Sequence, residues 1–472
     1  MHLTFCGAAQ EVTGSAHLLT LDDGFTILLD CGMYQGRSDE MVGFNEQWLF
    51  NPQTIDCVVL SHAHIDHSGR LPKLYKDGFR GNIYATPATH SLCTIMLIDS
   101  AKIQEQDAGY YHKVNHKKNR PNNKVREPLY TQADAIAVMN QFVGVSYNRW
   151  LRIHPEVEVY YKDAGHILGS ANVTLRIRRG KQEVTLGFTG DIGRKDRPIL
   201  RDPQQLAPVD YLISESTYGD RLHDEKPAEH DRFLRILKET CLEQKGKLII
   251  PAFSIGKTQE LIYMMDQMAN EERLPNIPIF VDSPLSTSAT EVYALHPECY
   301  DADLTEYLIT DPNPFGFNNL TFTRSVESSK ALNGRKDPCV IISASGMMNA
   351  GRVKHHLANH IEDARNTFLM VGYCAPGTQG HALRSGEKRV HVFGEWKDVN
   401  ARVEMMDSFS AHADRDEMRE YLNGQQQKVK QLFLVHGILP VQQSFSELLI
   451  KDGFSDVQIP ELGQEYTLHG LD

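Results

Sequence analysis

Three histidines and an aspartate fall within one short stretch of the chain, Ser61-His62-Ala63-His64-Ile65-Asp66-His67-Ser68-Gly69. Imidazole nitrogens and carboxylate oxygens are ligands that suit zinc and similar divalent cations. A tight loop can direct His62 and His64 toward one cation, and Asp66 and His67 toward another. A polar surface loop that happens to be rich in histidine is the alternative, but four ligand-type side chains at this spacing make it the weaker interpretation.

Two polar residues that could complete such a site, His166 and Asp191, stand singly among glycines. Each would normally be structural, but beside an incomplete two-metal set each becomes a candidate ligand. Glu215 and His436 end apolar strand-like runs, and His412 precedes a helix, without a metal-binding pattern of their own. The carboxylate of Asp191 can bridge two cations, which a neutral imidazole cannot do. Asp30 is equally well read as a turn residue before Gly32 or as an acceptor that orients a metal-bound histidine.

The elements around these residues are predicted from apolar patterning. The run 57–60 reads as a buried strand, so the histidine loop lies at a strand's carboxyl end, where open α/β folds place their sites. Apolar runs flank Asp22-Asp23-Gly24, which predicts a hairpin. Thr86 and Pro87 predict a helix start, with the helix ending near Gln106. The basic stretch 107–129 that follows is predicted to be a solvated insertion loop, with a phosphate-contacting arm as the alternative.

Beyond residue 209 the pattern changes to strands that alternate with helices, which predicts βαβ units and a mostly parallel sheet. The predicted strands are 247–250, 278–281, 340–343 and 367–372, with helices near 256–268, 286–295 and 350–361. We therefore expect one domain in two parts, 1–220 and 403–472, and a second domain inserted at 221–402.

Two stretches of the inserted domain could contact phosphate. Gly256-Lys257-Thr258 suggests a phosphate-binding loop. The motif also requires a glycine at position 251, but this chain has Pro251 there, so we reject that interpretation. Small residues before a helix start, followed by an arginine, make a better candidate in Ser343, Ser345, Gly346 and Arg352. A plain strand–helix connection explains that stretch as well.

Composition narrows the class of protein. With 41% apolar and 23% charged residues, the chain has a globular composition, and it contains neither an apolar run long enough to span a membrane nor a secretory signal. Eight cysteines are scattered without a Cys-x-x-Cys pair, which predicts reduced core residues and a cytoplasmic location. The net charge of −12 argues against a protein that is basic overall, but it leaves room for a locally positive nucleic-acid groove.

The order of these motifs resembles that of the metallo-β-lactamase superfamily. Within it, the chain is similar to the β-CASP ribonucleases, which include bacterial and archaeal homologues of the cleavage-and-polyadenylation endonuclease subunit. The family's first four motifs match Asp30, the stretch 62–67, His166 and Asp191, and the motifs of the β-CASP branch match Glu215, His412 and His436. The resemblance covers essentially the whole chain. It implies an α/β fold, an αββα sandwich with an inserted β-CASP domain.

The resemblance also implies a chemistry and a role for each site residue. His62, His64 and His166 would bind one zinc ion, and Asp66, His67 and His436 a second, with Asp191 bridging. Asp66, Asp191, Glu215 and His412 would be the catalytic residues, with His412 as the general acid held by Glu215. The expected reaction is hydrolysis of single-stranded RNA at internal phosphodiester bonds, leaving 5′-phosphate and 3′-hydroxyl ends.

Departures from the family and open alternatives remain. Ile438 stands where the family often has glutamate, and His381 stands where a basic residue is common. A 5′-exonuclease acting on RNA or DNA, and a partner-activated or non-catalytic RNA-processing subunit, are the alternatives. A small-molecule hydrolase is disfavoured, because a small substrate needs no inserted domain. The RNA target, the metal used in the cell and the oligomeric state stay open, with a homodimer as one candidate.

Overall fold

The computed structural model describes residues 1–36, 41–117, 127–223, 229–372, 374, 377–406 and 411–470. The chain folds into two compact units, Met1–Leu222 with His412–Asp472, and His223–Ala411. The first unit is therefore assembled from two separate pieces of chain, and the second is an insertion, as predicted. The predicted boundary at 402/403 is too early, because residues 402–405 form a strand that pairs with the sheet of the second unit.

Two seven-stranded sheets form the first unit. In spatial order, the first contains β22 (Glu465–Thr467), β1 (His2–Phe5), β2 (His17–Thr20), β3 (Thr26–Leu29), β4 (Cys57–Val59), β5 (Asn82–Ala85) and β6 (Phe142–Gly144). The second contains β21 (Val457–Gln458), β20 (Gln431–Val435), β11 (Tyr211–Glu215), β10 (Gln182–Phe188), β9 (Ala171–Arg179), β8 (Val157–Asp163) and β7 (Trp150–His154).

Alternating apolar residues on the facing sides of these sheets make the core. Phe5 and Ile27 from the first sheet belong to one buried cluster with Tyr161 and Ile213 from the second. Strands β2 and β3 form the predicted hairpin, whose turn places Gly24 at φ +90°, a conformation that L side chains rarely adopt. Strands β3 to β6 run parallel, which directs the ends of β3 and β4 to the same edge.

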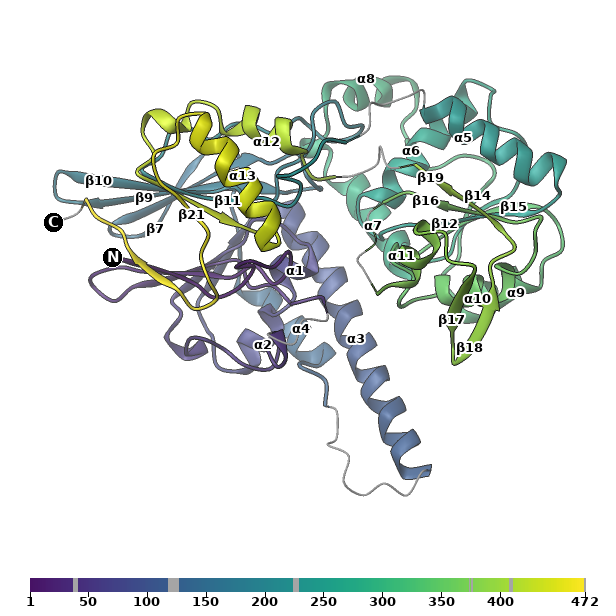
Figure 1. Ribbon diagram of the computed structural model, residues 1–472, viewed down its shortest axis with the longest axis horizontal. Helices are drawn as coiled ribbons and strands as arrows, with labels where there is room; N and C mark the ends of the chain where they lie inside the picture. Colours follow the sequence, from purple (N-terminus) through teal and green to yellow (C-terminus); the bar gives the residue numbers. More distant parts are fainter. Residues whose placement is uncertain are drawn as a thin grey trace. The chain divides into compact units, whose positions relative to one another are not determined.

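Helices cover the outer faces of both sheets (Figure 1). They are α1 (Ile65–Ser68), α2 (Leu71–Lys76), α3 (Pro87–Lys117) and α4 (Gln132–Val138) on the first sheet, and α12 (Arg415–Leu422) and α13 (Leu439–Lys451) on the second. Short 3-10 turns occupy Pro52–Thr54, Met139–Gln141 and Gln425–Gln427. Met418 of α12 and Phe445 of α13 pack with Leu432 of β20 in a second buried cluster. The predicted αββα sandwich is confirmed.

Helix α3 is longer than the sequence pattern indicates. The pattern predicts an end near Gln106, but the helix continues to Lys117. The residues between contain no proline, and the next one in the chain is Pro121, so polar residues can extend an existing helix at low cost. Although α3 spans 31 residues, neither it nor any other helix in the described ranges is apolar enough to cross a bilayer. Lys118, Arg120, Lys124 and Arg126 of the predicted basic loop lie outside the described residues.

A six-stranded sheet forms the centre of the second unit, and all of its strand pairs are parallel, as predicted. Its order is β14 (Leu320–Phe322), β13 (Ile279–Val281), β15 (Cys339–Ser343), β12 (Lys247–Pro251), β16 (Thr367–Met370) and β19 (Arg402–Met405). The helices are α5 (Glu229–Leu237), α6 (Lys257–Asn270), α7 (Pro284–Leu295), α8 (Ala302–Thr310), α9 (Val326–Gly334), α10 (Val353–His360) and α11 (Gln379–Arg384). A π-helical turn, Lys238–Glu243, and a 3-10 turn, Pro297–Cys299, complete them.

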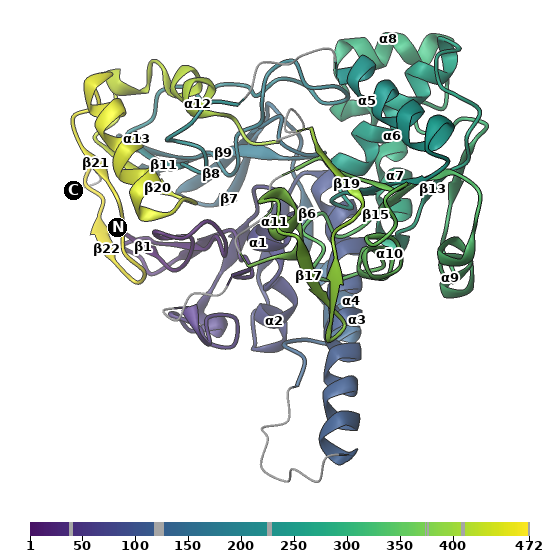
Figure 2. The same cartoon turned by 45° about the vertical axis from the view of Figure 1, so that its right-hand side comes forward.

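A separate two-stranded hairpin, β17 (Arg389–Val392) and β18 (Glu395–Asp398), lies beside α10 and α11 (Figure 2). Val390 and Val392 on its inner face pack with Leu357 of α10, Leu383 of α11 and Phe368 of β16. The hairpin is thus anchored by one apolar face, and its other face is exposed.

Candidate metal centre

The candidate ligands come together because strand ends from both sheets of the first unit meet at one edge. Asp30 follows β3, and the histidine loop follows β4. In the other sheet, His166 lies after β8, Asp191 after β10 and His436 directly after β20. These strands run in the same direction within each sheet, so side chains at their carboxyl ends face a common space.

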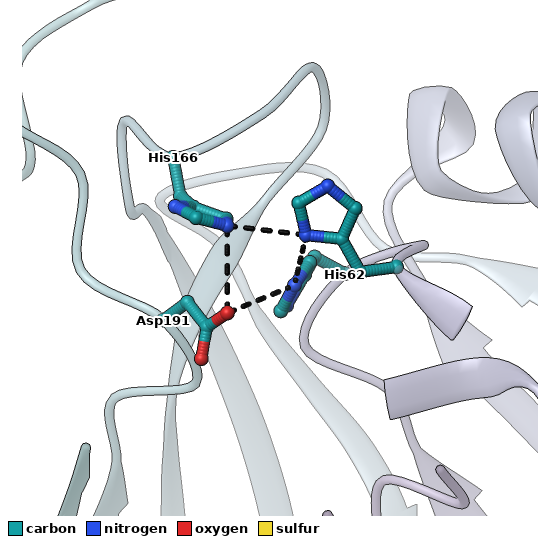
Figure 3. A group of neighbouring side chains, drawn as sticks. His62, His166 and Asp191 are labelled. Atoms are coloured by element: carbon teal, nitrogen blue, oxygen red, sulfur yellow. Dashed lines mark hydrogen bonds and ion pairs between the residues drawn. The ribbon is translucent and has the colours of Figure 1, made fainter. Parts of the chain in front are cut away.

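One group of donor atoms contains His62, His64, His166 and Asp191. The Nδ1 atom of His64 lies 3.1 Å from Nε2 of His62 and 3.2 Å from Nε2 of His166. Both of those Nε2 atoms lie 3.4 Å from Oδ2 of Asp191, so the two rings point at the same carboxylate (Figure 3). Two ligand atoms on a tetrahedral ion with bonds of about 2.0 Å are about 3.3 Å apart. These donors therefore already have the spacing of a tetrahedral metal site.

The second group contains Asp66, His67 and His436. Nε2 of His436 lies 3.2 Å from Nε2 of His67 and 3.5 Å from Oδ2 of Asp66. The other oxygen of Asp191, Oδ1, lies 3.2 Å from Nε2 of His67 and 3.7 Å from Nε2 of His436. Asp191 thus directs one oxygen to each group.

A buried polar atom supports a cation at this position. Oδ1 of Asp191 is buried and has no hydrogen-bond partner among the described residues, and leaving such an atom unsatisfied is costly. A cation between the seven converging side chains would satisfy this oxygen and offset the cost of gathering the donor atoms. The donor set therefore fits a metal centre.

Hydroxyl and carboxylate groups behind the ligands fix the histidine rings. Nδ1 of His67 donates to Oδ2 of Asp30 at 2.6 Å. The Ser61 hydroxyl donates to the same oxygen at 2.9 Å, and it accepts from Nδ1 of His62 at 3.0 Å. The Thr217 hydroxyl lies 2.9 Å from Nδ1 of His436. In each ring the Nδ1 bond leaves Nε2 directed at the donor groups, as in metal-binding histidines generally.

Close backbone packing holds the loops in register. A Cβ atom on Gly193 would lie 1.9 Å from the carbonyl oxygen of Gly165, next to His166. Asp30 and His436 both adopt the left-handed backbone region, at φ 58° and 54°. Such conformations in residues other than glycine cost energy and persist where the surroundings impose them. At His436 the backbone N–H donates to the carbonyl of Ala8 at 2.8 Å.

The charge states of Asp191, His64 and His166 suit metal ligands, whereas Asp191 and Asp30 outweigh the effect of burial and raise the pKa of His67 well above its usual range. Burial alone would raise the pKa of Asp191, but the surrounding histidines His436, His67, His62 and His412 hold it well below its usual range. Burial lowers the pKa of His64 to about 3 and that of His166 well below its usual range. At neutral pH these groups are therefore an anionic carboxylate and neutral imidazoles, the forms that bind cations.

A buried glutamate and a histidine lie beside both donor groups. Nδ1 of His412 lies 3.2 Å from Oε2 of Glu215, and its ring centre lies 4.6 Å from that of His166 and 5.9 Å from that of His436. Glu215 also accepts from the Ile192 N–H and, at 2.6 Å, from the Thr217 hydroxyl. Burial would lower the pKa of His412, but Glu215 and Asp191 together raise it to about 9.

Comparison with known proteins places the chain in a family. The sequence matches the metallo-beta-lactamase superfamily over residues 9–238, the Beta-Casp domain over 258–383 and the Zn-dependent metallo-hydrolase RNA specificity domain over 396–460. It is 34% identical to ribonuclease TTHA0252 of Thermus thermophilus over 464 residues, which cover 98% of this chain and 99% of that protein. The chain belongs to the β-CASP ribonuclease family.

Two further relatives extend this comparison. The β-CASP protein described here is 30% identical to transcription termination factor FttA of Methanosarcina mazei, over 93% of this chain and 67% of that factor. A crystal structure of a protein of unknown function from Enterococcus faecalis shares the fold, with a TM-score of 0.54, 13% identity and 99% of both chains covered.

The predicted phosphate contacts of the β-CASP domain belong to the second unit and are already engaged inside it. The Arg352 guanidinium donates to Oδ1 of Asp282 at 2.8 Å and to the carbonyls of Thr323 and Arg324 at 2.9 and 2.7 Å. The hydroxyl of Ser343 donates to the Asp282 carbonyl at 2.9 Å, and that of Ser345 to the Ala350 carbonyl at 3.4 Å. A phosphate role for these residues and Gly346 stays a prediction.

Two departures from the family pattern can also be located. Ile438 is the N-cap residue of α13, with 46% of its surface exposed and no side-chain capping bond. His381 lies in the first turn of α11, where its backbone N–H donates to the Thr378 hydroxyl. Ser61 and Thr217 are the site residues that sequence reasoning missed. Ser61 directly precedes His62, but no sequence pattern identifies a serine at a strand end as a partner of a metal-binding histidine.

Proposed function

We propose that this β-CASP protein is a zinc-dependent ribonuclease that cuts single-stranded RNA at internal bonds and leaves 5′-phosphate and 3′-hydroxyl ends. The observation that carries the proposal is the pair of donor groups that share Asp191, with His412 held beside both by Glu215. The names of the matched RNA specificity domain and of the Thermus thermophilus relative support RNA as the substrate.

Two zinc ions are the cofactors that the donors suit best. His62, His64 and His166 would hold one ion, and Asp66, His67 and His436 the other, with one oxygen of Asp191 for each. Zinc supplies a Lewis acid for the phosphoryl oxygens and makes water a nucleophile near neutral pH. Asp66 and Asp191 would supply negative charge to hold the zinc ions, and Asp30 fixes the ring of His67, a candidate ligand.

The protein's own proton donor decides which bond breaks. Nδ1 of His412 faces Glu215, so we assign the transferable proton to Nε2. A proton delivered to the 3′-oxygen of the leaving nucleotide stabilises that oxygen as the bond to phosphorus breaks. The upstream fragment then ends in a 3′-hydroxyl, and the phosphate stays on the downstream fragment as a 5′-phosphate.

The test follows 5′-labelled single-stranded RNA on a gel, with zinc-loaded wild-type protein and the Asp191→Ala variant. Internal fragments from the wild type only, with metal content checked by elemental analysis, would support the proposal. Labelled mononucleotide from the first time point would show a 5′-exonuclease and overturn internal cleavage. Intact RNA with two zinc ions per chain would overturn catalysis by the chain itself and favour a partner-activated or non-catalytic subunit.

We also propose a cytoplasmic location, on the ground that the cysteines are buried core residues with free thiols. A homodimer stays a prediction, to be tested by sedimentation velocity.

A further inference from the structure

The C-terminal ends of α6 and α8 bring two carboxylates together in the second unit. Asp266 belongs to α6, and Asp311 is the C-cap residue of α8. The two helices lie side by side (Figures 1 and 2), and the rings of Tyr263 and Tyr307 meet between them with centres 5.4 Å apart. The carboxyl groups of Asp266 and Asp311 are close enough to share a hydrogen bond. This junction between the helices therefore gathers two groups of like charge.

One oxygen of Asp266 has a partner and the other has none. The Tyr307 hydroxyl donates to Oδ2 at 2.7 Å. Oδ1 is buried without a hydrogen-bond partner among the described residues, and only 1% of the surface of Asp266 is exposed. Buried carboxylates are usually paired with a positive charge or bound to a metal, because burying the charge alone is costly. Oδ1 of Asp266 lacks such a partner within the described part of the chain.

Two neutral donors bond the carboxylate of Asp311. Its Oδ1 accepts from the Asn313 N–H at 2.9 Å, and its Oδ2 accepts from the Asn270 amide at 2.7 Å. A carboxylate can accept about four hydrogen bonds, so both oxygens keep lone pairs that could bind an ion. Asp311 is half-buried, which gives water and ions access to it. The junction is therefore open to solvent at Asp311 and closed at Asp266.

The surroundings of the two carboxylates add negative charge. The last turns of α6 and α8 contain no basic residue, and the C-terminus of a helix carries a partial negative charge that disfavours a carboxylate. Arg273, three residues beyond α6, pairs instead with Glu271 and Asp231. Burial and the nearby Asp311 raise the pKa of Asp266 to about 7, so above that pH both groups are anionic. A cation would therefore be attracted to this junction.

We infer that Oδ1 of Asp266 and the carboxylate of Asp311 bind a hydrated divalent cation of the magnesium type, which fastens the end of α8 to α6. Magnesium binds oxygen ligands, and it is commonly held by one or two carboxylates while it keeps several waters. One buried and one half-buried carboxylate fit that pattern. Zinc would prefer the histidines of the first unit, because two carboxylates offer it neither nitrogen nor sulfur. Without a cation, the ionised carboxylate of Asp266 would destabilise the fold.

The experiment is differential scanning calorimetry of the full, zinc-loaded chain at about pH 8, where the carboxyl group of Asp266 is ionised. Magnesium chloride at about ten times its dissociation constant should raise the unfolding temperature of the second unit by about 3–6 °C more than sodium chloride of equal ionic strength does. Asp266→Asn keeps an acceptor for the Tyr307 hydroxyl, and Asp311→Asn keeps one for the Asn313 N–H. Each variant should lose the magnesium shift.

Asp337→Asn is the matched control, since it replaces an aspartate of the second unit whose side chain is 77% exposed, and it should keep the magnesium shift. A wild-type shift no larger than that with sodium chloride would overturn the inference. A magnesium shift that persists in Asp266→Asn or in Asp311→Asn would also overturn it, because magnesium would then bind elsewhere. Should Asp311→Asn fail to fold, Asp266→Asn alone decides. These outcomes are the same whether or not the chain cuts RNA.

Discussion

At the scale of single residues, the centre depends on hydroxyl groups as well as on its ligands. Thr217 donates to Glu215, which holds the proposed proton donor His412. Thr217 also accepts from His436, a candidate ligand of the second group, so this one side chain connects the two residues. Removing a group that orients a metal ligand typically weakens metal binding by about 10- to 100-fold.

Thr217→Val is therefore expected to lose metal from the second donor group while keeping the shape of the side chain. Dialysis against a weak chelator followed by elemental analysis should find close to one zinc per chain instead of two. Thr310→Val, at an exposed threonine of α8, is the matched control and should keep the wild-type content. Full metal content in Thr217→Val would show that His436 is oriented without the hydroxyl.

Asp266 of the second unit gives a prediction on pH. Burial raises its pKa to about 7, although a hydrogen bond from Tyr307 at 2.7 Å acts in the opposite direction. The folded chain then holds this proton more tightly than the unfolded chain does. The resulting contribution to the free energy of unfolding is fully present below about pH 4. It decreases as the pH rises from about 4 to about 7.

Asp266→Asn keeps an acceptor for Tyr307 and cannot ionise. It should be more stable than the wild type at pH 8 by about 1 kcal/mol, because the carboxylate no longer has to be buried. The two proteins should converge near pH 4 to 5. Thermal unfolding followed by circular dichroism at several pH values would test this, and a difference that does not change with pH would contradict it.

At the scale of elements, the loops after β8 and β10 are packed too closely for any side chain at Gly193. Gly193→Ala should push the loop of His166 away from that of Asp191, with a loss of about 1–3 kcal/mol in stability and of zinc from the first donor group. Gly334→Ala, at the end of α9, meets no atom within 4 Å and should leave both quantities unchanged. Urea unfolding and zinc content would separate the two variants.

The helices and strands also show which parts of the fold and of the candidate site the sequence could predict. The candidate ligands could be singled out because they stand where apolar strand-like runs end, and the structure brings all seven together. Their role as metal ligands stays a prediction. The end of α3 could not be predicted, because polar residues without proline neither favour nor forbid a helix. The predicted end of the insertion at residue 402 divides β19, a strand without a clear sequence signal that the structure shows paired with β16. Ser61 and Thr217 were missed because their role depends on a neighbour that is remote in the sequence or in another strand.

At the scale of the whole molecule, the two units should respond differently to metal. All seven candidate ligands belong to the first unit, and a ligand that binds only the folded state stabilises it. Removing zinc with a chelator should lower the unfolding temperature of the first unit and leave that of the second unchanged. Differential scanning calorimetry with and without added zinc would resolve this. Equal shifts of both transitions would show that the units unfold together.

The first unit is assembled from two pieces of chain, and this has a consequence for protein synthesis. His67 and His436 contact each other across 369 positions of sequence. His412, His436, β20 and β22 all follow the inserted unit. A ribosome therefore completes the early ligands first and the last ones only after the whole insertion has been made, at about 5–20 residues per second. The growing chain therefore lacks a complete set of candidate ligands until His436 has been made.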